Sequence, residues 1–146
     1  MIKIHFVCTG NAFRSRLAEA YLKSKEMPDV SVSSSGIEAQ KNINGFMCRY
    51  TLTLAKADEI EDYLSKNWTV TTKAEIESQD KVIFMKKEHY LFCLKTLNCK
   101  LPAYEIWEIE DVYDLNSSPK PDELIKIATP IYEKIKDKVD LLSFSS

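Results

Sequence analysis

The chain lacks the features that mark membrane-spanning, secreted and metal-binding proteins. No apolar run in its 146 residues approaches the roughly 20 residues of a membrane-spanning helix. The four cysteines show no C-x-x-C spacing and there are only two histidines, so neither a disulfide framework nor a zinc site is expected. The short apolar run near the N-terminus leads into a cysteine and polar residues, which is typical of a strand and not of a signal peptide. We therefore expect a cytoplasmic protein with reduced thiols, without a metal ion or other cofactor and without a membrane partner.

The chain also lacks a strong excess of either charge. Its formal net charge is −2, which gives no electrostatic reason to expect nucleic acid as a partner. The composition, 45% apolar and 29% charged, is ordinary for a soluble globular protein, and no repeat or low-complexity linker divides the chain. We expect residues 1–146 to form a single domain that acts as a monomer.

Strand-like and helix-like patterns alternate along the chain. Apolar or alternating runs predict four strands, at residues 2–7, 30–34, 81–85 and 104–108. Helical spacing predicts helices at residues 15–25, 46–63, 88–97 and 119–139, and residues 42–45 are expected to form a loop. This order implies an α/β fold in three αβα layers, with a four-stranded parallel sheet and right-handed crossovers.

Two local features refine this prediction. Thr71 or Thr72 is expected to cap a short helix that ends at Ser78, because a threonine hydroxyl can accept a bond from a first-turn amide. Pro130 is expected to kink or interrupt the last helix, because proline has no amide proton for the helical hydrogen bond.

The most informative segment is the loop after the first predicted strand, Cys8-Thr9-Gly10-Asn11-Ala12-Phe13-Arg14-Ser15. A tight turn from strand to helix aims backbone N–H groups and a helix N-terminus into one concavity, which suits a phosphate. These donors and the Arg14 guanidinium favour the thiolate of Cys8, and the planar guanidinium can hold two oxygens of a tetrahedral anion. A thiolate in such a cradle is a nucleophile directed at phosphorus. A buried structural cysteine followed by a solvated arginine would show the same bare spacing.

Three side chains are expected to shape this loop. Ser15 can donate a hydrogen bond to the Cys8 sulfur and cap the following helix. Asn11 can adopt the left-handed backbone conformation that asparagine tolerates, with Ser34 bracing its side chain.

The segment resembles the phosphate loop of the low-molecular-weight protein tyrosine phosphatase family. In that family a cysteine, five residues, an arginine and a serine or threonine follow the first strand, and Cys8, Arg14 and Ser15 match. Gly10, Asn11 and the following Leu-Ala-Glu-Ala also match, and the similarity extends over essentially the whole chain. The resemblance implies that residues Thr9, Gly10, Asn11, Ala12, Phe13, Arg14 and Ser15 bind the phosphate.

The family's second signature is an acid in an Asp-Pro-Tyr-like stretch on a late loop. Asp111 and Tyr113 fit that place, which implies that Asp111 is the general acid and that Tyr113 forms a wall of the substrate pocket. Asp111 could also be one more solvated acid in an acidic segment, and Glu110 is the alternative acid. The resemblance implies hydrolysis of phosphotyrosine in proteins, or of small aryl phosphates, through a phosphocysteine and without a cofactor.

Three departures from the family pattern leave other functions open. Phe13 replaces a second cysteine, Arg16 replaces a proline after the loop, and Val112 replaces the proline after the acid. The missing prolines leave open a phosphocysteine carrier or a phosphate-binding module without catalysis.

Two related enzyme activities share the loop. A thioredoxin-coupled arsenate reductase would need a further cysteine near the end of the third strand, where this chain has Met85. Protein arginine phosphatases favour threonine two residues before the arginine, where this chain has Ala12.

The remaining reactive side chains are expected to be structural. Cysteines 48, 93 and 99 are expected to act as small apolar residues, and Trp107 is expected in the core. His5 lies inside a predicted strand and His89 in a predicted helix, so neither is expected to be a catalytic base.

Overall fold

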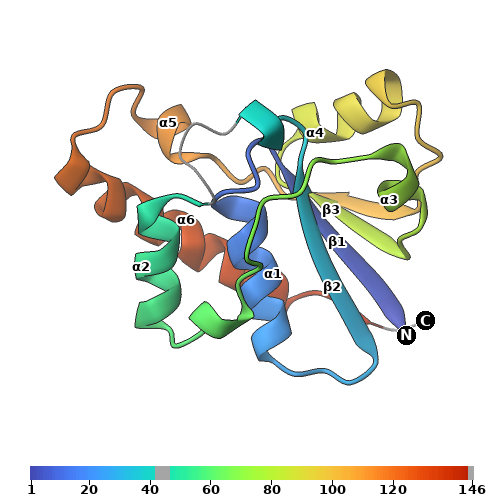
Figure 1. Ribbon diagram of the computed structural model, residues 1–146, viewed down its shortest axis with the longest axis horizontal. Helices are drawn as coiled ribbons and strands as arrows, with labels where there is room; N and C mark the ends of the chain where they lie inside the picture. Colours follow the sequence, from blue (N-terminus) through green and yellow to red (C-terminus); the bar gives the residue numbers. More distant parts are fainter. Residues whose placement is uncertain (42–46, 145–146) are drawn as a thin grey trace.

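The four strands form one parallel sheet in the order β2-β1-β3-β4 (Figure 1). The computed structural model describes residues 1–41 and 47–144, so the loop expected at residues 42–45 lies outside the described part. The strands are β1 (Ile2–Cys8), β2 (Val30–Gly36), β3 (Lys81–Phe84) and β4 (Ala103–Ile106). The predicted four-stranded parallel sheet is confirmed, with shifts of one or two residues at the strand ends.

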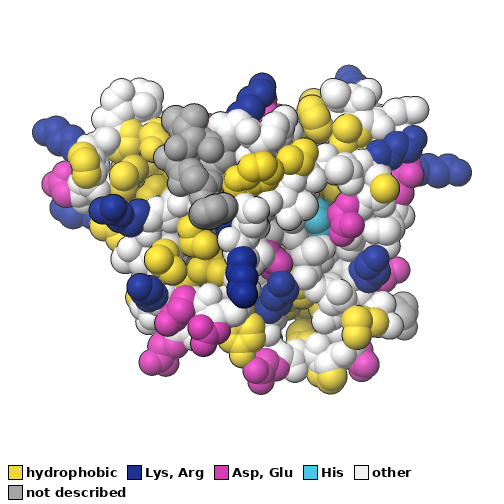
Figure 2. All heavy atoms as spheres, viewed as in Figure 1, with side chains coloured by type: hydrophobic (Ala, Val, Ile, Leu, Met, Phe, Trp, Pro, Cys, Tyr) yellow, Lys and Arg dark blue, Asp and Glu magenta, His cyan; other side chains and the backbone are white. Residues whose placement is uncertain are grey.

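Helices cover both faces of this sheet, as the three-layer prediction requires. The helices are α1 (Arg14–Ser24), α2 (Arg49–Ala57), α3 (Lys73–Glu77), α4 (Lys87–Leu91), α5 (Val112–Leu115) and α6 (Pro121–Asp140). Figure 1 shows α1, α2 and α6 on one side of the sheet and α3 and α4 on the other. The described part of the chain has no helix long and apolar enough to cross a membrane. Basic and acidic side chains are interspersed over the face drawn in Figure 2.

The central strand β1 separates two apolar cores. Successive side chains of a strand point to opposite faces, so Phe6 packs with Leu17 and Trp107 in the larger core, beneath α1 and α6. Val7 packs with Phe84 in the smaller core, on the other face. Because both faces are covered, β1 reads as a nearly continuous apolar run, and its last residue, Cys8, lies at the carboxyl edge of the sheet.

Two predicted helices are shorter than their sequence patterns suggested. The helix expected over residues 46–63 is α2, which ends at Ala57, and a separate 3₁₀ turn follows at Glu61–Tyr63. Glu59 lies between them with a φ of 59°, a left-handed conformation that stops an α-helix. The helix expected over residues 88–97 is α4 for its first turns and then widens into a π-helical turn at Phe92–Thr96.

The predictions about the cap of the short helix and about the proline in the last helix differ in outcome. Thr72 caps α3, since its hydroxyl accepts a hydrogen bond from the Glu75 amide at 3.3 Å, as expected. The expected interruption at Pro130 is wrong, because α6 continues through it from Pro121 to Asp140, and the alternative of a kink stays a prediction. The apolar face of α6, which includes Ile131 and Ile135, is buried in the larger core, and this packing outweighs the one lost helical hydrogen bond.

The buried His5 ties the stability of the fold to pH. Its ring nitrogens lie 2.6 Å from the Ser33 hydroxyl and 2.7 Å from the Ser35 hydroxyl, on the neighbouring strand β2. Burial, aided by the nearby Lys3, lowers the pKa of His5 from 6.5 to about 4, although the Glu75 carboxylate is 4.0 Å away. Below pH 6.5 His5 is therefore protonated in the unfolded chain but stays neutral in the folded chain until about pH 4. The free energy of unfolding consequently falls as the pH drops from 6.5 towards 4.

We predict that His5→Gln reduces this loss of stability on acidification by about 1.4 kcal/mol per pH unit, the value for one proton. Urea unfolding of wild type and variant at pH 7 and pH 5 measures the difference, and the carboxylates common to both proteins cancel. An equal loss of stability in the two proteins would mean that His5 is protonated in the native state.

Candidate active site

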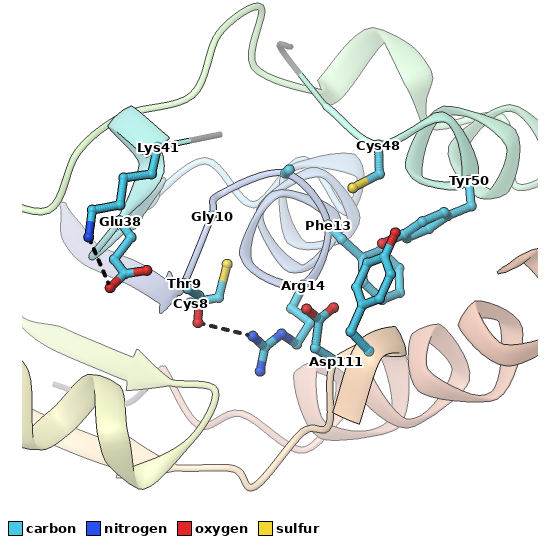
Figure 3. Close-up of a pocket in the computed structure, with 12 residues that line it drawn as sticks. Cys8, Thr9, Gly10, Phe13, Arg14, Glu38, Lys41, Cys48, Tyr50 and Asp111 are labelled. Carbon is cyan, nitrogen blue, oxygen red and sulfur yellow. Dashed lines mark hydrogen bonds and ion pairs between the residues drawn. The ribbon is translucent and has the colours of Figure 1, made fainter. Parts of the chain in front are cut away.

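A cavity of about 210 Å³ opens at the carboxyl edge of the sheet, where the loop between β1 and α1 meets three other segments (Figure 3). The loop contributes one side, and the segments after β2, before and in α2, and at the start of α5 contribute the others. The lining residues are Cys8, Thr9, Gly10, Ala12, Phe13, Arg14, Glu38, Lys41, Cys48, Tyr50, Asp111 and Tyr113. The structure therefore brings Cys8, Arg14, Asp111 and Tyr113, which are separated by up to about a hundred residues in sequence, to one cavity.

The loop is held open by the side chain of Asn11, which lies behind it and is fully buried. Asn11 has a φ of 53°, the predicted left-handed conformation. Its amide nitrogen donates to the hydroxyl of Ser34 at 2.9 Å and to that of Ser15 at 2.8 Å, and its oxygen accepts from the Thr69 amide at 2.8 Å. The predicted brace by Ser34 is confirmed.

The sulfur of Cys8 receives hydrogen bonds from inside the loop. The Asn11 amide lies 3.3 Å from the sulfur and the Ser15 hydroxyl lies 2.9 Å from it. The Ser15 hydroxyl also accepts from Asn11 and lies 3.4 Å from the Ser35 carbonyl oxygen, to which it can donate; when its proton is turned to the sulfur instead, the bond stabilises a thiolate. The expectation that Ser15 also caps α1 is wrong: α1 begins after Phe13, and Ser15 is inside the helix with its hydroxyl directed to the sulfur.

Arg14 is buried, with 3% of its surface exposed, at the base of the cavity. Its two terminal nitrogens donate to the Ile109 carbonyl at 2.9 Å and to the Thr9 hydroxyl at 3.4 Å. These two acceptors fix the plane of the guanidinium, which is the group best suited to hold two oxygens of a tetrahedral anion.

Asp111 lies at the N-terminus of α5, and Figure 3 shows its carboxylate beside the Arg14 side chain. Its Oδ1 accepts from the Val112 amide at 2.9 Å, and its own amide donates to Asp114 at 2.9 Å. This helix cap holds the carboxylate at the cavity although the following residue is not proline. Glu110, the alternative acid, instead pairs with Lys86 at 2.9 Å.

Aromatic rings form one wall of the cavity. Phe13 and Tyr50 pack edge to face with ring centroids 4.9 Å apart, and Tyr113 is half exposed at the rim. Cys48 packs in the larger apolar core, as expected of a small apolar residue, and it also faces the cavity. Burial raises the pKa of Cys48 to about 11, so its thiol stays protonated at neutral pH.

Four residues that line the cavity were not predicted from the sequence: Glu38, Lys41, Cys48 and Tyr50. Glu38 and Lys41 carried a usable signal, because they follow the end of β2 and loops at the carboxyl edge of a parallel sheet meet at the same place. Cys48 and Tyr50 carried none, because they reach the cavity only through the packing of α2 against the rest of the fold. The described residues contain no cluster of three or more histidine, cysteine or acidic side chains that would hold a metal ion.

Comparisons with known proteins agree with this geometry. The sequence model of the family described as low molecular weight phosphotyrosine protein phosphatase matches residues 3–140. An arsenate reductase of Staphylococcus aureus is 30% identical over 103 residues, which are 61% of this chain and 75% of that protein. A protein-arginine-phosphatase of Geobacillus stearothermophilus is 51% identical, but over only 37 residues, a quarter of each chain.

Solved structures show the same fold. The low molecular weight protein tyrosine phosphatase SP-PTP from Streptococcus pyogenes superposes with a TM-score of 0.75 at 18% identity, covering 99% of this chain and 95% of that one. A YwlE mutant from Bacillus subtilis gives a TM-score of 0.72 at 24% identity, covering 96% and 97%. At these identities the likeness concerns the fold alone.

The close approach of β2 to the loop predicts which glycine is indispensable. A Cβ placed on Gly36 would lie 2.6 Å from the Asn11 nitrogen and 2.6 Å from the Thr9 oxygen, both backbone atoms of the loop. We predict that Gly36→Ala displaces the loop and lowers the free energy of unfolding by about 1–3 kcal/mol, the usual cost of overpacking.

Gly10→Ala is the matched control, because no described atom lies within 4 Å of a Cβ placed there. Urea denaturation should show wild-type stability or slightly more for this variant. A Gly36→Ala protein as stable as Gly10→Ala would mean that β2 and the loop can separate without cost.

Proposed function

The chain belongs to the low-molecular-weight phosphotyrosine protein phosphatase family, and on that premise we propose that it hydrolyses aryl phosphate monoesters, foremost phosphotyrosine in proteins. The family is one of cysteine-based phosphatases. The observation that carries the proposal is the cavity itself, which is lined by a thiol, a guanidinium and a carboxyl group and bounded by aromatic rings. We propose that it acts as a cytoplasmic monomer on phosphotyrosine proteins or small aryl phosphates, and not on nucleic acid.

In the first step the Cys8 thiolate attacks phosphorus and the bond from phosphorus to the phenolic oxygen breaks. Arg14 and the N–H groups of residues 9–15 hold the three non-bridging oxygens as their charge redistributes. Protonated Asp111 gives its proton to the departing oxygen, which would otherwise leave as a basic phenolate. The products of this step are the free phenol and a phosphocysteine.

In the second step water attacks the phosphocysteine. Asp111, now a carboxylate, takes a proton from that water, and the bond from sulfur to phosphorus breaks. The thiolate returns to its hydrogen bonds with the Asn11 amide and the Ser15 hydroxyl, and inorganic phosphate leaves. The cycle needs no redox change and regenerates both Cys8 and Asp111.

The aromatic wall supports a phosphotyrosine substrate. Phe13, Tyr50 and Tyr113 offer flat apolar surfaces against which a phenyl ring can pack. Arsenate reduction has less support, because Met85 directly follows the end of β3, where a further cysteine would be needed, and Cys93 and Cys99 pack in the smaller core with Val7. The thiols of Cys93 and Cys99 therefore lie on the face of the sheet opposite α1, the helix that follows the phosphate loop.

Phosphoarginine is the second candidate substrate, because one specific residue favours it. The carboxylate of Glu38 lines the cavity and could receive a guanidinium, although it also lies 3.7 Å from the Lys41 ammonium. Initial rates with phosphotyrosine, phosphoarginine and p-nitrophenyl phosphate test the choice. Faster turnover of phosphoarginine than of phosphotyrosine would overturn the tyrosine assignment.

We predict that Cys8→Ser folds normally and releases no phosphate, because a serine hydroxyl does not ionise at neutral pH and cannot replace the thiolate. Circular dichroism and urea unfolding check the fold, and release of p-nitrophenol checks turnover. Phosphate release by a folded Cys8→Ser protein would contradict the phosphocysteine mechanism.

We predict that Asp111→Asn slows hydrolysis of phosphotyrosine by about 10²–10⁴-fold, the usual contribution of a general acid. The same variant should slow p-nitrophenyl phosphate much less, because p-nitrophenolate is a weak base and leaves without a proton. The ratio of the two kcat/KM losses is the measurement, and Glu110→Gln is the matched control on the neighbouring carboxylate. Equal losses on both substrates would give Asp111 a role in binding or folding only.

A further inference from the structure

His89 is a fully buried imidazole to which the mechanism gives no part. It lies in α4, on the opposite side of the sheet from α1, yet its Nε2 is 2.9 Å from the hydroxyl oxygen of Thr9 in the phosphate loop. Its Nδ1 accepts a hydrogen bond from the Lys86 backbone amide at 3.0 Å. An amide can only donate, so Nδ1 carries no proton and Nε2 carries the single proton of a neutral ring. The direction of the contact follows: His89 donates to Thr9.

The surroundings hold the ring in this neutral form. Burial is the main cause, and the charges of Arg14 and Lys86 add to it, while Asp114 opposes it; together they lower the pKa of His89 from 6.5 to about 3. The ring therefore keeps one tautomer at every pH at which the protein would work, which makes it a constant donor and not an acid–base group.

The Thr9 hydroxyl connects His89 to the arginine of the cradle. It also accepts from the Arg14 guanidinium at 3.4 Å, so both acceptor positions of this one oxygen are used, one by His89 and one by Arg14. The other terminal nitrogen of Arg14 donates to the Ile109 carbonyl at 2.9 Å. Thr9 is thus one of the two acceptors that set the guanidinium plane, and His89 determines where the Thr9 oxygen points.

We propose that His89 is a positioning residue for phosphate binding, which orients the Arg14 guanidinium through the Thr9 hydroxyl. The inference rests on the proposed function, since it assumes that the loop binds a phosphate. Without the His89 donor, the Thr9 hydroxyl can rotate away from Arg14, and the guanidinium loses part of the constraint that presents it to two phosphate oxygens.

Two substitutions separate this role from a purely structural one. In His89→Asn the side-chain oxygen can replace Nδ1 as acceptor for the Lys86 amide, but the side chain is too short to reach Thr9. In His89→Gln the terminal amide can replace Nε2 as donor to Thr9, while the bond to Lys86 is lost. The proposal predicts weak phosphate binding in His89→Asn and near wild-type binding in His89→Gln. A role limited to capping α4 predicts instead that His89→Gln is less stable and that His89→Asn is not impaired.

The readout is protection of Cys8 from iodoacetate by inorganic phosphate, followed by mass spectrometry of the Cys8 peptide, which measures phosphate affinity without turnover. We expect the apparent Kd for phosphate to rise about 3- to 10-fold in His89→Asn and in Thr9→Val, the range that one neutral hydrogen bond carries. Thr9→Ser, which keeps the hydroxyl, should restore binding. The double variant His89→Asn/Thr9→Val should be no weaker than either single variant, because both remove the same contact.

Cys93→Ala is the control for a general loss of packing. It truncates a fully buried side chain in the π-helical turn that directly follows α4, and that side chain packs in the smaller core. It should lower the thermal midpoint and leave phosphate affinity unchanged.

The outcomes distinguish the inference from its premise. If phosphate does not protect wild-type Cys8, the cradle itself is wrong and the inference falls with it. If phosphate protects wild type, while His89→Asn binds as tightly or the double variant shows additive losses, the proposed function stands and the role of His89 is overturned.

Discussion

The phosphate loop depends on the side chain of Asn11, because one buried amide joins four segments of the chain. It connects the loop to α1 through Ser15, to β2 through Ser34, and to the strand-like segment before α3 through the Thr69 amide. A left-handed φ at a residue other than glycine costs about 1–2 kcal/mol, which these three hydrogen bonds offset. Without these three hydrogen bonds the loop would not be held in the conformation that directs its backbone amides towards the Cys8 sulfur.

The polar contacts beneath the loop continue into α1, a helix that is buried on nearly every side and therefore needs partners for its polar residues. Ser34 donates to Glu19 at 2.6 Å, and Glu19 in turn accepts from Lys23 at 2.6 Å near the surface. Arg16 is fully buried and donates to the Ser65 carbonyl, and burial lowers the pKa of its guanidinium while Glu19 opposes that change. Charged residues are tolerated at such depth only when they are paired.

The two sides of the sheet contribute different things to the cavity. From the side of α1, Phe13 and Tyr50 supply an apolar wall, and the Ala12 carbonyl receives the Cys48 amide at 3.2 Å and the Thr51 hydroxyl at 2.6 Å, which attaches α2 to the loop. From the side of α4, His89 reaches the loop through Thr9. Arg14 lies between them and is oriented by acceptors from the loop and from the segment after β4.

The sequence by itself determined the order of strands and helices, the phosphate loop and its key residues, because these depend on local patterns. An apolar run before Cys8, a tight turn and a helix predicted from Ser15 require no distant information, and the observed helix begins one residue earlier, at Arg14. It also indicated Asp111, but only through resemblance to a family, since an acidic residue in an acidic segment has no distinctive local pattern. The sequence did not predict the end of α2, where Glu59 adopts a left-handed φ, nor the continuity of α6 through Pro130, where burial of the helix face outweighs local propensity.

Only the tertiary structure decided which distant residues share the cavity and in what state. Cys48 and Tyr50 reach the cavity because α2 packs beside the loop. Asp111 lines the cavity, whereas the neighbouring Glu110 pairs with Lys86. The neutral tautomer of His89 follows from the amide of Lys86, the residue that precedes its helix, and from a hydroxyl 80 residues away. Such contacts join residues that are far apart in sequence, and their direction and charge depend on burial, which one-dimensional spacing does not specify.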